Sequence, residues 1–239
     1  MASINNSPAV KKGLVLAAGL GKRLLPLTKD TPKPLLPVQG VAMLDRAISK
    51  LTEVGITEII VNTHHHASQV KEHLRKYDNS NITLHIIHEE KLLDVGGSIM
   101  NAMQRFAAEP LLVFNSDVLL EGSLQPLLDK WDASKMQALL LLQDSQQLLD
   151  ARQWGDFDLA ENGKIIRNAG GGRYVWTGIY IMTPEIFAGY RLRTFYITEI
   201  VSKATPQNFD KYAWYGLVNQ TKWLDIGNAA NYEYANNSW

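Results

Sequence analysis

The sequence has no cysteine, no net charge and no long apolar run. The lack of cysteine excludes disulfides and thiolate metal sites, and it gives no sign of an oxidising compartment. The 24 basic residues balance 24 acidic ones, which argues against nucleic acid or an anionic membrane as a partner. The longest apolar run, residues 138–142, is far too short to span a bilayer. We therefore expect a soluble cytoplasmic protein.

Residues 1–12 are polar and lack the apolar centre of a signal peptide, so we treat them as an N-terminal tail. The remaining chain is long enough for one α/β domain, and 46% hydrophobic residues can form a sizeable core. Short apolar runs predict buried strands at 14–17, 58–62, 82–87 and 110–115, with helical patterns between them. This alternation predicts a parallel sheet, in which ligands bind beyond the carboxyl ends of the strands.

The stretch from Leu14 to Val38 reads LVLAAGLGKRLLPLTKDTPKPLLPV and combines an apolar strand with a glycine loop and cations. Gly19 and Gly21 allow backbone N–H groups to approach an anion closely. Lys22 and Arg23 follow directly, and Lys33 stands between two prolines that stiffen the backbone. These features together predict a binding site for a nucleotide, and most simply for a triphosphate.

This loop differs from both common phosphate-binding motifs. A P-loop would need glycine at Leu16 and a hydroxyl residue at Arg23, and a dinucleotide fingerprint would need glycine at Leu24. Another type of nucleotide site is therefore expected.

Two further segments follow expected strands. Asp117 comes just after the strand 110–115, where it is placed either to bind Mg²⁺ through its oxygens or to form an Asx turn. Gly96 and Gly97 open an expected helix, where they either bring backbone close to a base or ribose or form a plain helix entry with Ser98 near the cap. His64, His65 and His66 are adjacent residues that cannot converge on a metal, so we interpret them as loop residues, with His64 a candidate to hydrogen-bond a sugar.

Four motifs together resemble the signature of the sugar-1-phosphate nucleotidyltransferases. They are L-A-A-G-x-G-x-R from Leu16, T-P-K-P-L-L-P-V from Thr31, [NG]-x-D at 115–117 and W-x-D-[IV]-G at 223–227. The resemblance extends from about residue 13 to residue 232. The hexapeptide repeats of a left-handed β-helix, which longer relatives append, do not occur. The chain most resembles the short single-domain branch that includes N-acetylmuramate α-1-phosphate uridylyltransferase and mannose-1-phosphate guanylyltransferase-like proteins.

The resemblance implies a Rossmann-like three-layer α/β/α fold of the GT-A-like kind, with a mostly parallel central sheet. It also implies one domain over 13–239. The nucleotide half covers about 13–142, and a β-rich sugar-binding part covers about 143–239.

The resemblance also implies roles for individual residues. Arg23 and Lys33 would be catalytic, and Asp117 and Asp225 would hold Mg²⁺. The implied nucleotide-binding residues are Leu16, Ala17, Ala18, Gly19, Gly21, Lys22, Gly96, Gly97 and Asn115. The implied sugar-pocket residues are Trp154, Gly155, Asp156, Thr177 and Gly178.

The chain departs from the family pattern at two places. Asp94 and Val95 stand where Glu and Thr are commonest, and residues 167–170 lack the Glu-Lys pair of many hexose enzymes.

The implied reaction joins a nucleoside triphosphate to a sugar 1-phosphate and releases pyrophosphate. Our leading hypothesis is UTP with N-acetylmuramate 1-phosphate, in cell-wall recycling, and the second is GTP with mannose 1-phosphate. A cytidylyltransferase for a phosphorylated alcohol and a catalytically silent nucleotide-sugar-binding regulator are the other readings. The oligomeric state is expected to be a monomer or a small homo-oligomer.

Overall fold

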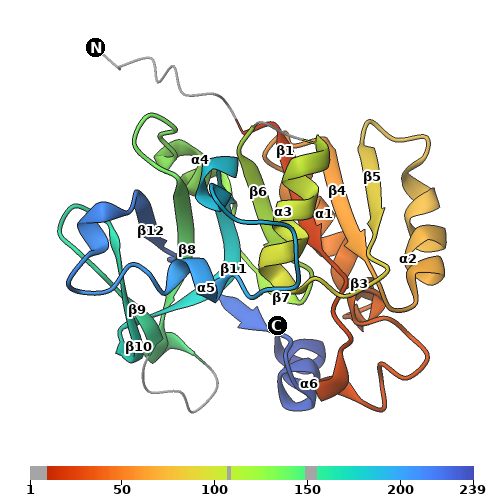
Figure 1. The fold of residues 1–239 in the computed structure, drawn as a ribbon. Coiled ribbons are helices and arrows are strands. Elements are labelled where there is room, and N and C mark those ends of the chain that lie inside the picture. Colours follow the sequence, from red (N-terminus) through yellow and green to blue (C-terminus); the bar gives the residue numbers. More distant parts are fainter. Residues whose placement is uncertain (1–9, 107–108, 149–154) are drawn as a thin grey trace.

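The computed structural model of the protein describes residues 10–106, 109–148 and 155–239. Trp154 and most of the polar tail lie outside these residues. Nine strands form one sheet (Figure 1), with the order β10-β9-β11-β6-β1-β4-β5, and β8 and β12 extend it from β11. The strands are β1 (Lys12–Leu16), β4 (Glu58–Thr63), β5 (Thr83–His88), β6 (Leu111–Asn115), β8 (Ala138–Asp144), β9 (Gly155–Leu159), β10 (Ile165–Gly172), β11 (Tyr174–Met182) and β12 (Trp214–Val218).

The first part of the chain, from β1 to β6, is built on parallel strands, as the sequence predicted. β1 lies between β4 and β6 and is parallel to both, so that Leu14 pairs with Ile60 on one side and with Val113 on the other. All three side chains are fully buried. β5 continues the parallel set beside β4. Because these four strands run in one direction, the loops that follow them gather at one edge of the sheet.

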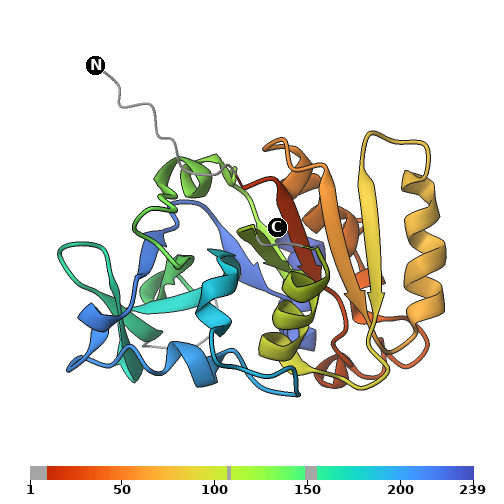
Figure 2. The same ribbon diagram turned by 45° about the horizontal axis from the view of Figure 1, so that its top comes forward.

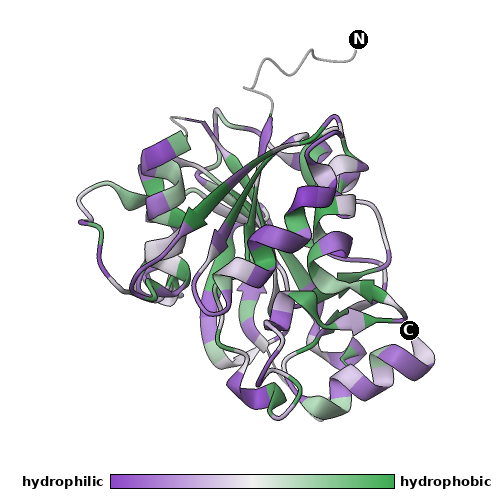
Figure 3. Ribbon diagram, turned by 90° about the vertical axis from the view of Figure 1, so that its right-hand side faces the viewer, coloured by the Kyte–Doolittle hydropathy of each residue, from purple (hydrophilic) through white to green (hydrophobic). Residues whose placement is uncertain are grey.

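Helices cover both faces of the sheet and make three layers (Figures 1 and 2). Alternating residues of β1 serve opposite faces, because successive side chains of a strand point to opposite sides. Leu14 belongs to the core beneath α3 (Asp94–Phe106) and α5 (Thr198–Val201), and Val15 to the core beneath the other helices. Those helices are α1 (Met43–Thr52), α2 (Ala67–Leu74) and α4 (Gln125–Lys130). Figure 3 shows the hydrophobic residues concentrated on the strands between the helical layers.

The sheet differs from the sequence prediction at β11. We expected a mostly parallel sheet, with the residues from about 143 onward in a β-rich sugar-binding part. Instead β11 lies between β6 and β8 and is antiparallel to both. Its pairing with β8 shifts register between Trp176 and Tyr180, where Gly178 has φ +80°. Only glycine adopts this conformation readily, so β11 bends at this residue.

Three further segments follow β9. Residues 170–172, three consecutive glycines, form the end of β10, which pairs antiparallel with β9. A 3-10 turn covers Pro184–Phe187, and α5 covers only Thr198–Val201.

Two small two-stranded sheets complete the fold near the carboxyl edge of the parallel strands. β7 (Val118–Leu120) pairs antiparallel with β13 (Trp223–Asp225), and β2 (Pro37–Val38) pairs with β3 (Val41–Ala42). α6 (Ala229–Ser238) is capped by Asn228, whose side chain accepts a hydrogen bond from the N–H of Asn231. At the bottom of Figure 1, α6 lies beside the loop that follows β1. In the described parts of the chain, no helix is long and apolar enough to cross a membrane.

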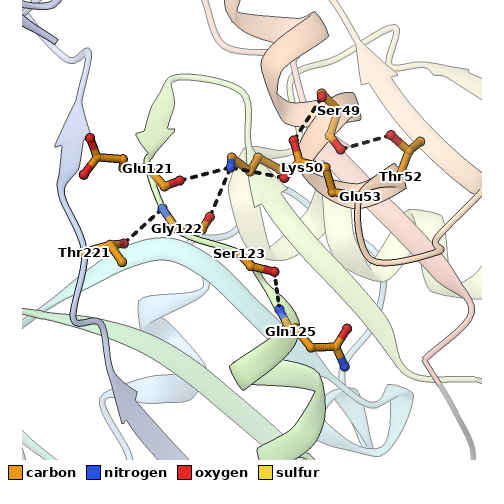
Figure 4. A network of polar contacts seen from close by, with 9 residues as sticks. All are labelled: Ser49, Lys50, Thr52, Glu53, Glu121, Gly122, Ser123, Gln125 and Thr221. Carbon is orange, nitrogen blue, oxygen red and sulfur yellow. Dashed lines mark hydrogen bonds and ion pairs between the residues drawn. The ribbon is translucent and has the colours of Figure 1, made fainter.

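A lysine of α1 ties this helix to the end of β7 (Figure 4). The Lys50 Nζ lies 3.3 Å from the carbonyl oxygen of Glu121, 3.1 Å from that of Gly122 and 3.2 Å from Glu53 Oε2. The Lys50 side chain is 19% exposed, so its ammonium group is only partly open to water. The lysine thus supports the segment that follows Asp117.

We predict that Lys50→Met lowers the free energy of unfolding by about 1 kcal/mol, because two carbonyls lose a charged donor. Urea unfolding followed by circular dichroism measures this change. Lys71→Met, at an exposed position of α2, is the matched control and should stay within about 0.5 kcal/mol of the parent. Equal losses in both variants would show that Lys50 contributes only as a surface charge.

Candidate active site

The loop after β1 is held in a defined shape at the carboxyl edge of the sheet. Gly21 has φ +64° and precedes a short 3-10 helix, Lys22–Leu24. The buried Thr28 donates its hydroxyl to the carbonyl of Gly21 at 2.9 Å, which closes the loop on itself. A second 3-10 turn, Lys33–Leu35, buries the stem of Lys33. The predicted phosphate loop is therefore an ordered cradle with cations at fixed positions.

Two polar residues that we did not identify from the sequence connect this loop to its neighbours. Asn62, at the end of β4, accepts a hydrogen bond from the N–H of Ala17 at 2.7 Å and donates one to Glu89 Oε1 at 2.8 Å. Glu89 also accepts the N–H of Leu93 at 3.1 Å, and it is only 3% exposed. Asn62 ends the second predicted strand and Glu89 follows the third, and these positions were a signal that could have identified them. The network fixes three loops relative to one another.

Lys33 and Asp117 form an ion pair at the centre of the site. The Lys33 Nζ lies 2.5 Å from Asp117 Oδ2, and the two side chains are 10% and 28% exposed. Ser116 holds the strand end in place by donating both its N–H and its hydroxyl to the carbonyl of Leu16, at 3.1 and 2.7 Å. A cation and a carboxylate with limited solvent access are thereby placed where the loops after β1 and β6 meet.

Asp225 comes to the same place through the pairing of β7 with β13. Asp225 stands opposite Val118, and the N–H of Ile226 donates to the carbonyl of Asp117 at 2.8 Å. A Cβ at Gly227 would lie 2.7 Å from Asp225 Oδ2 and 3.2 Å from Arg23 Nη1. Residues from four separate parts of the sequence, Arg23, Lys33, Asp117 and Asp225, therefore converge.

Two adjoining cavities open at this point. The first, of about 400 Å³, lies along the loop after β1, and the second, of about 260 Å³, lies against β11. They share four lining residues: Arg23, Val95, Asn115 and Asp117. The arrangement can hold two molecules end to end, with a cation and a carboxylate at their junction.

Most residues predicted for the nucleotide line the first cavity: Leu16, Ala18, Gly19, Gly21, Lys22 and Asn115. The two residues predicted to be catalytic, Arg23 and Lys33, line it as well. Ala17 is not in this lining, and its N–H is bound to Asn62. Gly96 and Gly97 line neither cavity. They are the third and fourth residues of α3, which begins at Asp94, whereas the helix was expected to begin at Ser98, after the glycine pair.

The residues predicted for the sugar divide into two groups. Thr177 and Gly178 line the second cavity together with Asp225. Gly155 and Asp156 line neither cavity. Gly155 packs against the backbone of Tyr174, and Asp156 pairs with Arg167 at 2.9 Å. The ring of His64 contacts the carbonyl of Glu89 at 2.8 Å and is likewise absent from both linings.

The second cavity also has an aromatic and aliphatic wall that we did not predict. Trp176 and Tyr180 from β11 and Trp223 from β13 line it, together with Val175 and Ile197. Complete burial raises the pKa of Tyr180, so its hydroxyl stays protonated. The bend at Gly178 sets which β11 side chains face the cavity, and periodicity alone does not reveal that bend.

The donor set at the junction has the chemistry of a hard divalent cation site. Asp117 and Asp225 supply carboxylate oxygens, and Mg²⁺ commonly takes only one or two carboxylates and completes its shell with water and phosphate oxygens. Among the described residues, no group of three or more His, Asp or Glu side chains gathers to enclose a metal. These two carboxylates could therefore hold a metal together with a phosphate ligand, rather than a metal in a cage made only of protein.

The sequence is similar to known proteins over nearly its whole length. The sequence profile of the family described as "Nucleotidyl transferase" matches residues 12–239. An N-acetylmuramate alpha-1-phosphate uridylyltransferase from Caulobacter vibrioides is 33% identical over 76% of this chain and 79% of its own length. A probable mannose-1-phosphate guanylyltransferase from Oryza sativa is 25% identical over 92% of this chain and 62% of its own.

The fold is also similar to solved structures. A Bacillus anthracis protein assigned as a glucose-1-phosphate thymidylyltransferase superimposes with a TM-score of 0.80. It covers 94% of this chain and 93% of its own, at 23% identity. At this identity the similarity establishes the fold alone, and it confirms the predicted α/β class.

Glu89→Gln tests the network that holds the loops. Glu89 accepts two hydrogen bonds, whereas glutamine would turn an NH₂ group toward one of the two donors. We expect the free energy of unfolding to fall by about 1–3 kcal/mol, as for a buried donor left unsatisfied. Glu90→Gln, at the exposed neighbouring position, is the control. Chemical unfolding of both variants measures the difference, and an unchanged Glu89→Gln protein would contradict the role of the network.

Proposed function

The chain belongs to the nucleotidyl transferase family, and from this premise we propose that it transfers a nucleotidyl group from a nucleoside triphosphate to a sugar 1-phosphate. The products are a nucleotide-sugar and pyrophosphate. The sugar phosphate oxygen forms a bond to the α-phosphorus, and the bond from that phosphorus to the pyrophosphate oxygen breaks.

One observation carries this proposal: the two cavities share Arg23 and Asp117, and Lys33 is paired with Asp117 at their junction. In our assignment the triphosphate lies along the glycine loop in the first cavity. The sugar lies in the second cavity against β11, so that its phosphate meets the α-phosphate at the junction. A site for one ligand would not need two cavities that converge on the same charged groups.

The chain's own residues contribute positioning and charge. The attacking phosphate oxygen is already anionic, so the reaction needs no strong general base. In our assignment Lys33 binds the α-phosphate and the sugar phosphate and stabilises charge at the reacting centre. Arg23 binds the β- and γ-phosphates and the leaving pyrophosphate. The limited exposure of Lys33 strengthens its interaction with phosphate, because water screens it less.

We propose that Asp117 and Asp225 hold Mg²⁺ when the nucleotide is bound. The cation would supply charge neutralisation at the α-phosphate. Asp117 Oδ2 is already beside Lys33, so Asp117 would orient both the lysine and the metal. The pairing of β7 with β13 keeps the two carboxylates together.

For the substrates, we propose UTP and N-acetylmuramate 1-phosphate. The similarity to the Caulobacter vibrioides uridylyltransferase supports this pair, and with it a cytoplasmic role in peptidoglycan recycling. GTP with mannose 1-phosphate is the second candidate, because the Oryza sativa relative is described as a guanylyltransferase for that sugar. We propose a monomer or a small homo-oligomer.

A pyrophosphate-release screen with Mg²⁺ tests the substrates. It crosses UTP, GTP, dTTP, CTP and ATP with N-acetylmuramate, mannose, glucose and N-acetylglucosamine 1-phosphates. We expect the highest kcat/KM for UTP with N-acetylmuramate 1-phosphate. The highest value for GTP with mannose 1-phosphate would favour the second candidate, and nucleotide-sugar binding without turnover would favour a regulatory protein.

Lys33→Met should lower kcat by about 100-fold or more, because a preorganised cation at the reacting phosphates is lost. Lys29→Met is the matched control, because Lys29 is an exposed lysine of the same loop. Steady-state kinetics with the best substrate pair measure both variants. A Lys33→Met enzyme with unchanged kcat would exclude the assigned role.

Asp225→Asn should raise the Mg²⁺ concentration needed for half-maximal rate by about tenfold or more, because one anionic ligand is lost. A Mg²⁺ titration after EDTA treatment measures this concentration, and the EDTA-treated parent should be inactive until Mg²⁺ is restored. Asp78→Asn, at an exposed position after α2, is the control and should need the same Mg²⁺ concentration as the parent. Identical titrations for Asp225→Asn and the parent would remove Asp225 from the metal site.

A further inference from the structure

Gly96 and Gly97 make close contact with a segment from the sugar half. Their N–H groups lie 3.1 and 3.3 Å from the carbonyl oxygen of Phe195, to which both donate. A Cβ at Gly96 would lie 2.4 Å from the ring of Phe195, and one at Gly97 would lie 2.4 Å from the carbonyl oxygen of Arg193. Both distances are far below van der Waals contact, so any side chain at either position would displace residues 193–195.

Two more hydrogen bonds join the same segments. The N–H of Phe195 donates to the carbonyl of Leu93 at 3.1 Å, and the Thr194 hydroxyl donates to the carbonyl of Leu92 at 3.0 Å. Residues 92–97 and 193–195 therefore form a continuous contact, which we call the clasp. It joins segments about a hundred residues apart in the sequence.

The two sides of the clasp lead directly into the two cavities. Leu92, Asp94 and Val95 line the first cavity, and Val95 also lines the second. Ile197, two residues after Phe195, lines the second cavity. A displacement of 193–195 would therefore move a wall of the second cavity relative to the first.

Phe195 is well suited to fix this position. It is 2% exposed, its ring stacks on Tyr190 with centroids 5.4 Å apart, and it meets Phe187 edge-on at 6.3 Å. The Arg193 guanidinium lies 5.0 Å from the same ring. The aromatic ring is thus held on several sides and cannot shift away from a larger residue at Gly96 without a cost in packing.

We propose that the glycine pair acts through the clasp rather than on the nucleoside: Gly96, Gly97 and Phe195 are positioning residues that set the sugar cavity against the nucleotide cavity. This inference rests on the proposed function, because it assigns the second cavity to the sugar 1-phosphate. Glycine is required at 96 and 97 because the backbone of one half must approach the backbone of the other.

Phe195→Leu tests the clasp without changing any residue that lines a cavity. We expect the KM for the sugar 1-phosphate to rise by about tenfold, because the cavity wall at Ile197 is no longer fixed. The KM for the nucleotide should stay within about twofold of the parent. Phe106→Leu removes a ring that packs against the same core and contacts His85 rather than Phe195, and it should leave the ratio of the two KM values unchanged. The same ratio change in Phe106→Leu would show general core loosening and would overturn the proposal.

Gly96→Ala and the double variant Gly96→Ala/Phe195→Leu test the contact itself. Gly96→Ala should raise the sugar KM more than the nucleotide KM. If the cost of the methyl group arises from the Phe195 ring, the double variant should be less impaired than the two single changes predict. The proposal would be rejected if Gly96→Ala weakened nucleotide binding alone and the effects in the double variant were additive. The glycines would then be assigned to the nucleoside.

The clasp and the proposed function can fail separately. Thermal unfolding of the parent, Gly96→Ala, Phe195→Leu and the double variant measures the coupling between positions 96 and 195 without any substrate. Non-additive melting temperatures with no turnover for any substrate pair would keep the clasp and reject the proposed reaction. Additive melting temperatures would reject the clasp even in an active enzyme.

Discussion

The ion pair between Lys33 and Asp117 is the interaction on which the site depends. It joins the loop after β1 to the loop after β6, 84 residues apart in the sequence. β1 and β6 are adjacent parallel strands with Leu16 opposite Asn115, so both loops leave the sheet at the same level. The pair neutralises charge that would be costly with so little exposure, and it presents a cation and a carboxylate to any phosphate that enters.

The second half of the sheet adds a different capability. β11 runs antiparallel between β6 and β8, so it passes the carboxyl end of β6 from the opposite direction. Its bend at Gly178 places a wall of aromatic residues beside Asn115 and Asp117. The loops after the parallel strands line the first cavity, and the antiparallel β11 adds a wall of the second cavity beside it.

Small residues and backbone contacts hold these halves together. The C-terminal strand β13 reaches the site by pairing with β7, and α6 then packs beside the loop that carries Lys33. The network of Asn62 and Glu89 fixes the loops after the parallel strands, and the contact of 92–97 with 193–195 connects these loops to the part of the chain after β11. Geometry at the junction therefore also depends on Glu89, Gly96 and Phe195, which line neither cavity.

The sequence by itself determined the parallel strands, the cationic glycine loop and the presence of two candidate carboxylates, because these depend on local apolar runs and on motifs of adjacent residues. Only the tertiary structure decided the partner of each strand and the use of each glycine. The antiparallel insertion of β11 depends on pairing between distant segments, which no local periodicity specifies. For the same reason Gly96 and Gly97, which the sequence suggested for the nucleoside, contact Phe195, a residue about a hundred positions away.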